Sequence, residues 1–149
     1  MRPPQASRVA EVVDALLALA ASALPDLQVI DGPAAGSAVL VDEDVLQVAG
    51  GSPAVLVDQV REPGLSRGRV ETARVMCVLS CIAGMTETKT VRDRCKAALD
   101  ALAQALRDDG TLGGVVDAAT LGQTMEWHTL QSDGAVCEVL FEVTTVAHI

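Results

Sequence analysis

The side chains best suited to chemistry in this chain are those of two histidines and four cysteines. His128 and His148 lie outside any pattern that supplies a nucleophile or a metal ligand at a fixed spacing, so we interpret both as solvated strand residues. The cysteines lack a Cys-x-x-Cys spacing and lie in apolar segments; they are Cys77, Cys81, Cys95 and Cys137. We predict reduced, buried thiols, because residues four apart on one strand lie about 13 Å apart and cannot form a disulfide.

Glycine-rich and acidic stretches also fail to form a recognised binding motif. Residues 49–52 and 110–114 lack the Lys-Ser/Thr ending of a phosphate loop and the strand-to-helix setting of a dinucleotide site, so we predict turns there. The acidic triplet 42–44 lacks the alternating oxygen ligands and the distal Glu of a calcium loop. With aromatic residues at 1% of the chain, these observations favour an interaction protein without cofactor or metal over an enzyme.

Positive charge is concentrated in one part of the chain. We interpret the stretch from Asp58 to Arg69 as a long exposed loop, because it is rich in Pro, Gly and charged residues and has little to bury. The candidate interaction surface consists of Arg61, Glu62, Arg67, Arg69 and Arg74. In a chain of net charge -9 these arginines can dock an acidic neighbour. The alternative is local pairing of the arginines with Glu62 and Glu71.

Composition limits the class of protein. A chain of 149 residues, half of them hydrophobic, is typical of a single domain with a real core, which we assign to residues 1–149. The net charge of -9 argues against a protein that grips nucleic acid, because displacing counterions from phosphates requires clustered Lys and Arg. The apolar run at residues 15–24 is shorter than the ~18 residues of a membrane span. We therefore expect neither a membrane anchor nor a secretory signal.

The spacing of hydrophobic residues predicts the elements that position these side chains. Three- and four-residue spacing predicts two helices, one over residues 7–24 and one from Thr88 or Thr90 to about Asp108. Alternation predicts strands at 27–30, 38–41, 45–48, 69–82, 115–130 with a break at Gly122, and 135–148. This order predicts an α+β domain in which two helices pack on one face of a largely antiparallel sheet. The second face of the strand over 69–82 mixes polar and apolar residues, which suits contact with another subunit.

Short stretches in a particular order connect the chain with a known family. They are Ala23-Leu24-Pro25, Val29 to Pro33, Leu46 to Gly51, Glu71 to Ser80, Cys95 to Leu112, Gly134-Ala135-Val136, Phe141-Glu142-Val143 and Ala147-His148-Ile149. In their order and spacing, over nearly the whole chain, it resembles the tail terminator, or tail completion, proteins of siphophages infecting actinobacteria. It departs from them at residues 82–85, where those proteins often carry an aromatic residue, and residues 123–131 show no shared motif.

The resemblance implies a tail-terminator-like α+β subunit that forms a hexameric ring at the head–tail junction of the virion, assembled in the host cytoplasm. Such a ring caps the tail tube, ends its polymerisation and joins it to the head connector. The implied partners are further copies of the chain, the tail tube protein and a head-completion or connector protein, while DNA passes through without sequence-specific binding. No catalytic, cofactor or metal residue is implied. The alternatives are another neck protein, a stopper or head-completion subunit, and a small cytoplasmic ligand-binding domain with a pocket near Trp127 or His128.

Overall fold

The computed structural model describes residues 7–31, 44–48, 55–62, 66–83, 87–131 and 134–148, and the side chains of all these except 55–69 and 130–131. This part of the chain forms two helices and one sheet of seven strands. In chain order the elements are α1 (Val9–Ala23), β1 (Gln28–Asp31), β2 (Val45–Val48), β3 (Val55–Glu62), β4 (Ser66–Ala83), α3 (Thr88–Asp108), β5 (Ala118–Leu121), β6 (Glu126–Gln131) and β7 (Ala135–His148).

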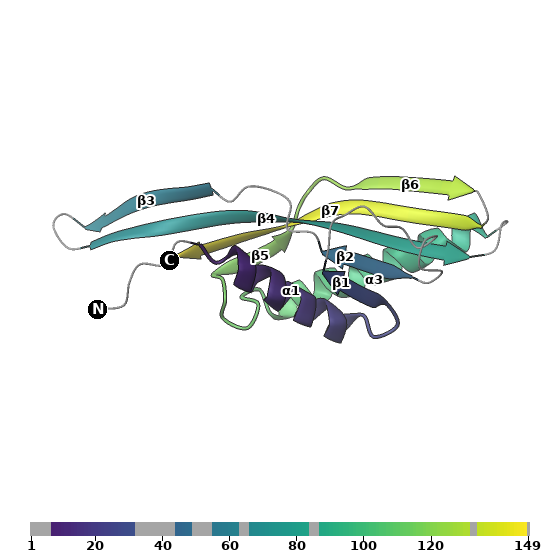
Figure 1. The fold of residues 1–149 in the computed structure, drawn as a ribbon, viewed down its shortest axis with the longest axis horizontal. Helices are drawn as coiled ribbons and strands as arrows, with labels where there is room; N and C mark the ends of the chain where they lie inside the picture. Colours follow the sequence, from purple (N-terminus) through teal and green to yellow (C-terminus); the bar gives the residue numbers. More distant parts are fainter. Residues whose placement is uncertain are drawn as a thin grey trace.

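Two long strands, β4 and β7, form the spine of the sheet. They pair antiparallel from Val70 opposite His148 to Ala83 opposite Ala135. The strand order is β1-β2-β4-β7-β5, with β3 also pairing with β4 and β6 also pairing with β7. Every pairing is antiparallel except that of β1 with β2. Both helices lie on the same side of this sheet (Figure 1), so the predicted α+β fold with two helices on one face is confirmed.

The core lies between the helices and the odd-numbered residues of β4 and β7. These strand residues alternate in burial because successive side chains of a strand point to opposite faces; the buried hydrophobic ones are Ala73, Val75, Cys77, Leu79, Cys81, Cys137, Val139, Phe141, Val143 and Ala147. The helices meet them with stripes of three- and four-residue spacing: Val12, Leu16 and Ala20 of α1, and Val91, Cys95, Leu99, Leu102 and Leu106 of α3. Each large side chain buried in this way stabilises the fold by roughly 1.5–3 kcal/mol.

The helix ends follow from local hydrogen bonds. At the start of α1 the cap residue is Arg8, and Ser7 Oγ accepts the Val9 N–H at 3.1 Å. The carboxylate of Glu71, 2% exposed, accepts the Arg8 N–H at 2.8 Å and places negative charge at the positive end of the helix dipole. Helix α3 begins at Thr88, the earlier of the two expected starts, with Glu87 at the cap position and both threonines in the first turn.

The prediction of an exposed loop from Asp58 to Arg69 is wrong. The structure has β3 up to Glu62 and β4 from Ser66, and these strands pair with Asp58 opposite Arg69 and Val60 opposite Arg67. Composition was misleading here, since the three valines of β3 favour a strand and backbone pairing needs no buried side chain. Residues 63–65 lie outside the described residues, as do the strand predicted at 38–41 and the first two residues of the acidic triplet.

Candidate interaction surfaces

The structure places all five residues of the predicted surface on the β3–β4 hairpin or its continuation. Arg61 and Glu62 belong to β3, and the three other arginines belong to β4. Of these, only Arg74 has a described side chain. It lies on the face of the sheet away from the helices, 3.9 Å from the carboxylate of Glu142, and its side chain is 53% exposed. Such an exposed pair contributes little to stability, so Arg74 is available to a partner. Docking of an acidic neighbour here stays a prediction.

The sheet face opposite the helices has a mixed character. Around Arg74 it presents half-buried side chains of both kinds from β4 and β7: Thr72, Met76, Leu140, Glu142, Thr144 and Val146. A hollow of about 570 Å³ lies here beside the link between β5 and β6. Toward β2 the same face is buried. The side chains of Gln47 and Ser80 lie there, and each has an oxygen without a hydrogen-bond partner among the described residues. The open part of this face therefore lies over the half of the sheet that carries β3 and β5.

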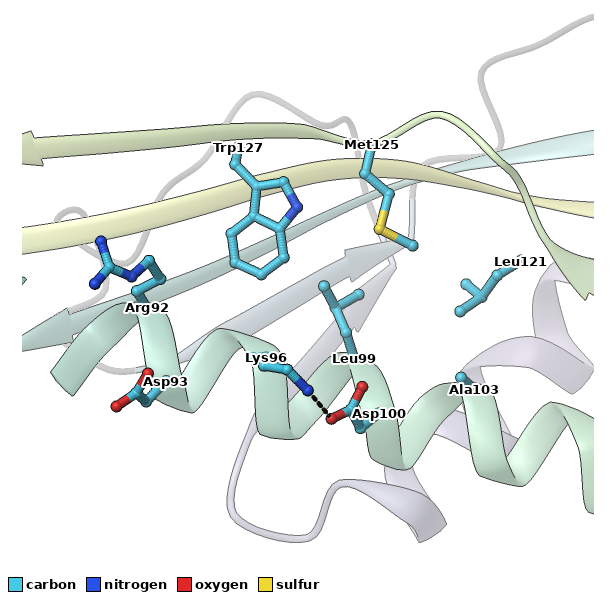
Figure 2. A pocket seen from close by; sticks show the side chains of 9 residues that line it. All are labelled: Arg92, Asp93, Lys96, Leu99, Asp100, Ala103, Leu121, Met125 and Trp127. Carbon is cyan, nitrogen blue, oxygen red and sulfur yellow. Dashed lines mark hydrogen bonds and ion pairs between the residues drawn. The ribbon is translucent and has the colours of Figure 1, made fainter. Parts of the chain in front are cut away.

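A second surface is a groove of about 480 Å³ between α3 and the strand edge formed by β5 and β6. Trp127 pairs with Val139, whose side chain faces the helices, so the indole projects to the helix side. Figure 2 shows Trp127 and Met125 pointing down toward α3, with Leu99 rising between them. Trp127 is 42% exposed, and it is the one exposed large hydrophobic residue in the described part of the chain. The ring is left partly uncovered because α3 runs beneath β4 and β7, inside the sheet edge.

The rim of this groove carries charged residues of both signs from α3. Lys96 contacts Asp100 at 2.6 Å, and Lys89 contacts Asp93 at 2.6 Å. The Lys89 ammonium lowers the pKa of Asp93, and Asp100 raises the pKa of Lys96, so Asp93 and Lys96 stay charged at neutral pH. Arg92 makes no hydrogen bond or ion pair within the described residues, and its charge also lowers the pKa of Asp93. The groove therefore combines an apolar floor with a rim of two cations and two carboxylates.

Four strands have an unpaired outer edge in the described part of the chain. Strands β1 and β3 lie at one border of the sheet, β5 and β6 lie at the other, and each pairs with a single neighbour. Such edges present rows of backbone N–H and C=O groups that can pair with another strand. The groove beside Trp127 runs directly along one of these edges.

Helix α1, which packs beneath β1 and β2, has an alanine-rich exterior. Its 15 residues include just two charged ones, Glu11 and Asp14, and both are exposed. The other exposed residues are small: Ala10, Ala18, Ala21 and Ser22. A surface helix normally carries a more strongly charged outer face, so this one is suited to close contact with another protein. At about 22 Å the helix is shorter than a bilayer core, and none of the helices described here is apolar over the length that crossing a membrane requires.

The thiols are buried and free, as predicted. Cys81 pairs across the sheet with Cys137, and the Cys95 thiol donates to the Cys137 carbonyl at 3.4 Å. Burial raises the pKa of Cys77 to about 12. Contact with the Cys81 thiol, together with burial, raises the pKa of Cys95. The thiols of Cys77 and Cys95 are therefore neutral at physiological pH and poor nucleophiles.

The histidines are exposed strand residues, each near a carboxylate. His128 Nε2 lies 3.7 Å from Glu126 Oε2. The His148 ring contacts Asp117, and the hydrogen bond lowers the pKa of that carboxyl. His128 and Trp127 point to opposite faces of the sheet. Of these two residues, near which a ligand pocket was considered, Trp127 lines the groove and His128 does not. Within the described ranges, no three His, Cys, Asp or Glu side chains are grouped to hold a metal ion.

Two surface features were not predicted from the sequence: the alanine-rich exterior of α1, and the groove that runs along an edge of the sheet. The exterior of α1 had a visible signal, the scarcity of charge between Val9 and Ala23. The position of the groove depends on which strands lie at the borders of the sheet.

The sequence matches none of the protein-family models and none of the curated proteins with which it was compared.

Proposed function

We propose that this protein is a structural subunit that assembles with copies of itself into a ring, and that this ring caps the tail tube at the head–tail junction of a siphophage virion. The observation that carries the proposal is the amount of uncovered surface suited to protein contact. It comprises the mixed sheet face, the outer edges of four strands that are unpaired among the described residues, and the alanine-rich exterior of α1. Surfaces of this kind on a small domain mark sites of association.

The place in the virion comes from the order of sequence segments, which resembles that of tail terminator proteins. The two-helix α+β fold is compatible with this resemblance. The net charge of -9 also suits a lumen through which DNA slides, because an acidic wall does not retain phosphates. A stopper or head-completion subunit of the neck is the nearest alternative, and it predicts binding on the portal side instead of to the tube.

A ligand-binding domain is the second candidate, favoured by one observation. The groove beside Trp127, about 480 Å³ with an apolar floor and the Arg92 guanidinium at its rim, has the size and lining of a small-molecule site. This candidate predicts a monomer whose melting temperature rises with an apolar carboxylate ligand. Ring formation without such a shift would eliminate it.

The proposal is tested with the purified full chain. Mass photometry and sedimentation should show a discrete species with a small whole number of copies, six by the family resemblance, and electron microscopy should show rings. Tail tube protein from the same phage should bind the rings at tube ends. Monomers at every concentration, with no binding to the tube, would refute the proposal. Binding to the portal-side connector but not to the tube would replace it with the stopper alternative.

A further inference from the structure

We propose that Cys81 and Cys95 form a latent redox crosslink, in which hydrogen peroxide converts the two free thiols into a disulfide that fastens α3 to β4. The cytoplasm keeps thiols reduced, whereas disulfides persist outside cells. The timing of the crosslink rests on the proposed function: a virion subunit folds and assembles in a reducing cytoplasm, and the disulfide forms after the particle is released. The crosslink itself is a property of the single chain.

Three thiols from three elements meet between the helices and the sheet. Cys81 of β4 pairs directly with Cys137 of β7. Cys95 comes from α3, and its thiol donates to the Cys137 carbonyl at 3.4 Å. The Cys95 thiol also makes hydrogen bonds with the thiols of Cys81 and Cys137, and the one with Cys81 contributes most to the rise in its pKa. The sulfur atoms of Cys81 and Cys95 are thus neighbours in the reduced protein.

The geometry of the sheet disfavours a disulfide between Cys81 and Cys137. The Ile82 N–H donates to Asp44 Oδ1 at 3.0 Å, so the backbone groups of Ile82 point toward the β2 side. Backbone groups alternate in direction along a strand, and those of Cys81 therefore point to β7. The Cβ atoms of such a hydrogen-bonded pair lie roughly 5.5 Å apart, beyond the roughly 3.5–4.5 Å of a disulfide. Cys95 reaches Cys81 from the helix layer, where this spacing does not apply.

A cavity gives an oxidant access to the Cys81 thiol. It has a volume of about 280 Å³ and lies between the end of α1 and α3, and of the three thiols only that of Cys81 belongs to its lining. A water molecule takes up about 30 Å³ in the liquid, so hydrogen peroxide, which is small and uncharged, fits this space. Because Cys81 is just 1% exposed, we expect a slow reaction that spares the chain during folding.

The reaction balances without a further reactant. The Cys81 sulfur, as the thiolate, attacks one oxygen of the peroxide; the O–O bond breaks, a sulfenic acid forms, and the released hydroxide leaves as water with the thiol proton. The Cys95 sulfur then attacks the Cys81 sulfur, so that the S–S bond forms and the S–O bond breaks. The hydroxyl leaves with the Cys95 proton as a second water. Two thiols are thus oxidised by two electrons, and one peroxide is reduced.

A neutral Cys95 thiol is compatible with this second step. It is a poor nucleophile toward reagents in solution, but its target here is an electrophilic sulfenic sulfur that it already contacts. The disulfide would close the loop between β4 and α3, and a crosslink of this kind stabilises a protein by restricting its unfolded chain. The helix layer would then be held to the sheet by a covalent bond as well as by packing.

Oxidation of the purified full chain tests the crosslink. Hydrogen peroxide should lower the intact mass by two hydrogen atoms, and peptide mapping should join Cys81 to Cys95. The melting temperature should rise by roughly 5 °C or more. Mapping is repeated in Cys77→Ala, because Cys77 and Cys81 belong to the same tryptic peptide.

Cys77→Ala is also the matched control, since the Cys77 thiol contacts the Val75 carbonyl and lies outside the group of three. It should keep both the crosslink and the rise in melting temperature, as should Cys137→Ala, whereas Cys95→Ala should lose both. Each variant is compared before and after oxidation, so a loss of stability from the substitution itself does not enter the result.

Thiols that stay reduced in the folded chain, and react only above its melting temperature, would overturn the proposal. A disulfide between any other pair of cysteines, or a crosslink that leaves the melting temperature unchanged, would overturn it as well. The proposed function is judged separately, by ring formation of the reduced chain. A crosslink in a chain that never assembles refutes the proposed function alone, and rings of a chain that forms no crosslink refute this inference alone.

Discussion

At the scale of single residues, burial determines what the thiols can do. Cys77 is fully buried in β4, where it pairs with Phe141 of β7, and desolvation holds its pKa near 12 against an ordinary value of 9.0. The thiols of Cys95 and Cys137 shift in the same direction. A group that stays protonated in the folded state and ionises in the unfolded state makes stability depend on alkaline pH.

The expected result is a protein whose stability is constant up to about pH 9 and then declines toward pH 12. Below the pKa that the thiol has in the unfolded state, both the folded and the unfolded protein carry the proton. The contribution of the thiol to stability is then fully present. Above that pKa the unfolded state loses the proton first, so each such thiol costs roughly 1 kcal/mol per pH unit. Urea unfolding at pH 7, 9 and 10.5 measures this. Cys77→Ala, less stable at pH 7, should show a shallower decline, and an unchanged slope would assign the effect to other groups.

At the scale of elements, close approach between β4 and β7 depends on one glycine. A Cβ on Gly134, where β7 begins, would lie 2.7 Å from the carbonyl oxygen of Ala83 at the end of β4. Because that neighbour is backbone, the strand ends must move apart to admit a side chain. The pairing of the two strands therefore fixes glycine at this position.

Gly134→Ala should lower the free energy of unfolding by about 1–3 kcal/mol, as overpacking does elsewhere. Gly110→Ala is the matched control, since a Cβ there meets only the Leu106 carbonyl oxygen at an ordinary 3.4 Å. The control should be neutral or stabilise by up to about 1 kcal/mol through reduced freedom of the unfolded chain. Chemical denaturation measures the free energy of unfolding of both variants. Equal losses of stability in the two variants would contradict the close approach at Gly134.

Local patterns were sufficient for the elements themselves. Three- and four-residue spacing predicted α1 and α3, and alternation predicted β4 and β7, because each pattern reflects one buried face. The β3–β4 hairpin was missed because proline, glycine and arginine mark loops by composition, while pairing between Val60 and Arg67 depends on backbone hydrogen bonds. The groove could not be predicted from the sequence. It arises from the position of α3 relative to the sheet edge, which no local pattern encodes.

At the scale of the whole molecule, the arginine hairpin and the Trp127 groove are separate candidates for contact. The hairpin belongs to the end of the sheet that carries β3, whereas the groove lies beside β6 (Figure 1). One can therefore serve subunit assembly while the other meets a different partner. Arg74, exposed and weakly paired with Glu142, extends the hairpin toward the open sheet face.

The double change Arg61→Ala and Arg67→Ala tests the hairpin. If it docks an acidic neighbour, affinity for the tail tube or connector protein should fall by about tenfold, with rings of normal size. Binding assays at two salt concentrations measure this, because screening weakens an electrostatic contact in the original chain more than in the variant. Arg107→Ala, on α3, serves as the control. Unchanged binding and particle assembly would remove the hairpin from the interface.

The continuous pairing of β4 with β7 also determines how the molecule carries a mechanical load. Fourteen residue pairs join the strands without interruption, from Val70 opposite His148 to Ala83 opposite Ala135, over roughly 45 Å. Their hydrogen bonds lie perpendicular to the strands. A force along the strands therefore loads all the hydrogen bonds between β4 and β7 at once in shear, whereas a force across the strands breaks these bonds one after another. The subunit is thus stiff along its length, and it yields first at the short strands on its borders.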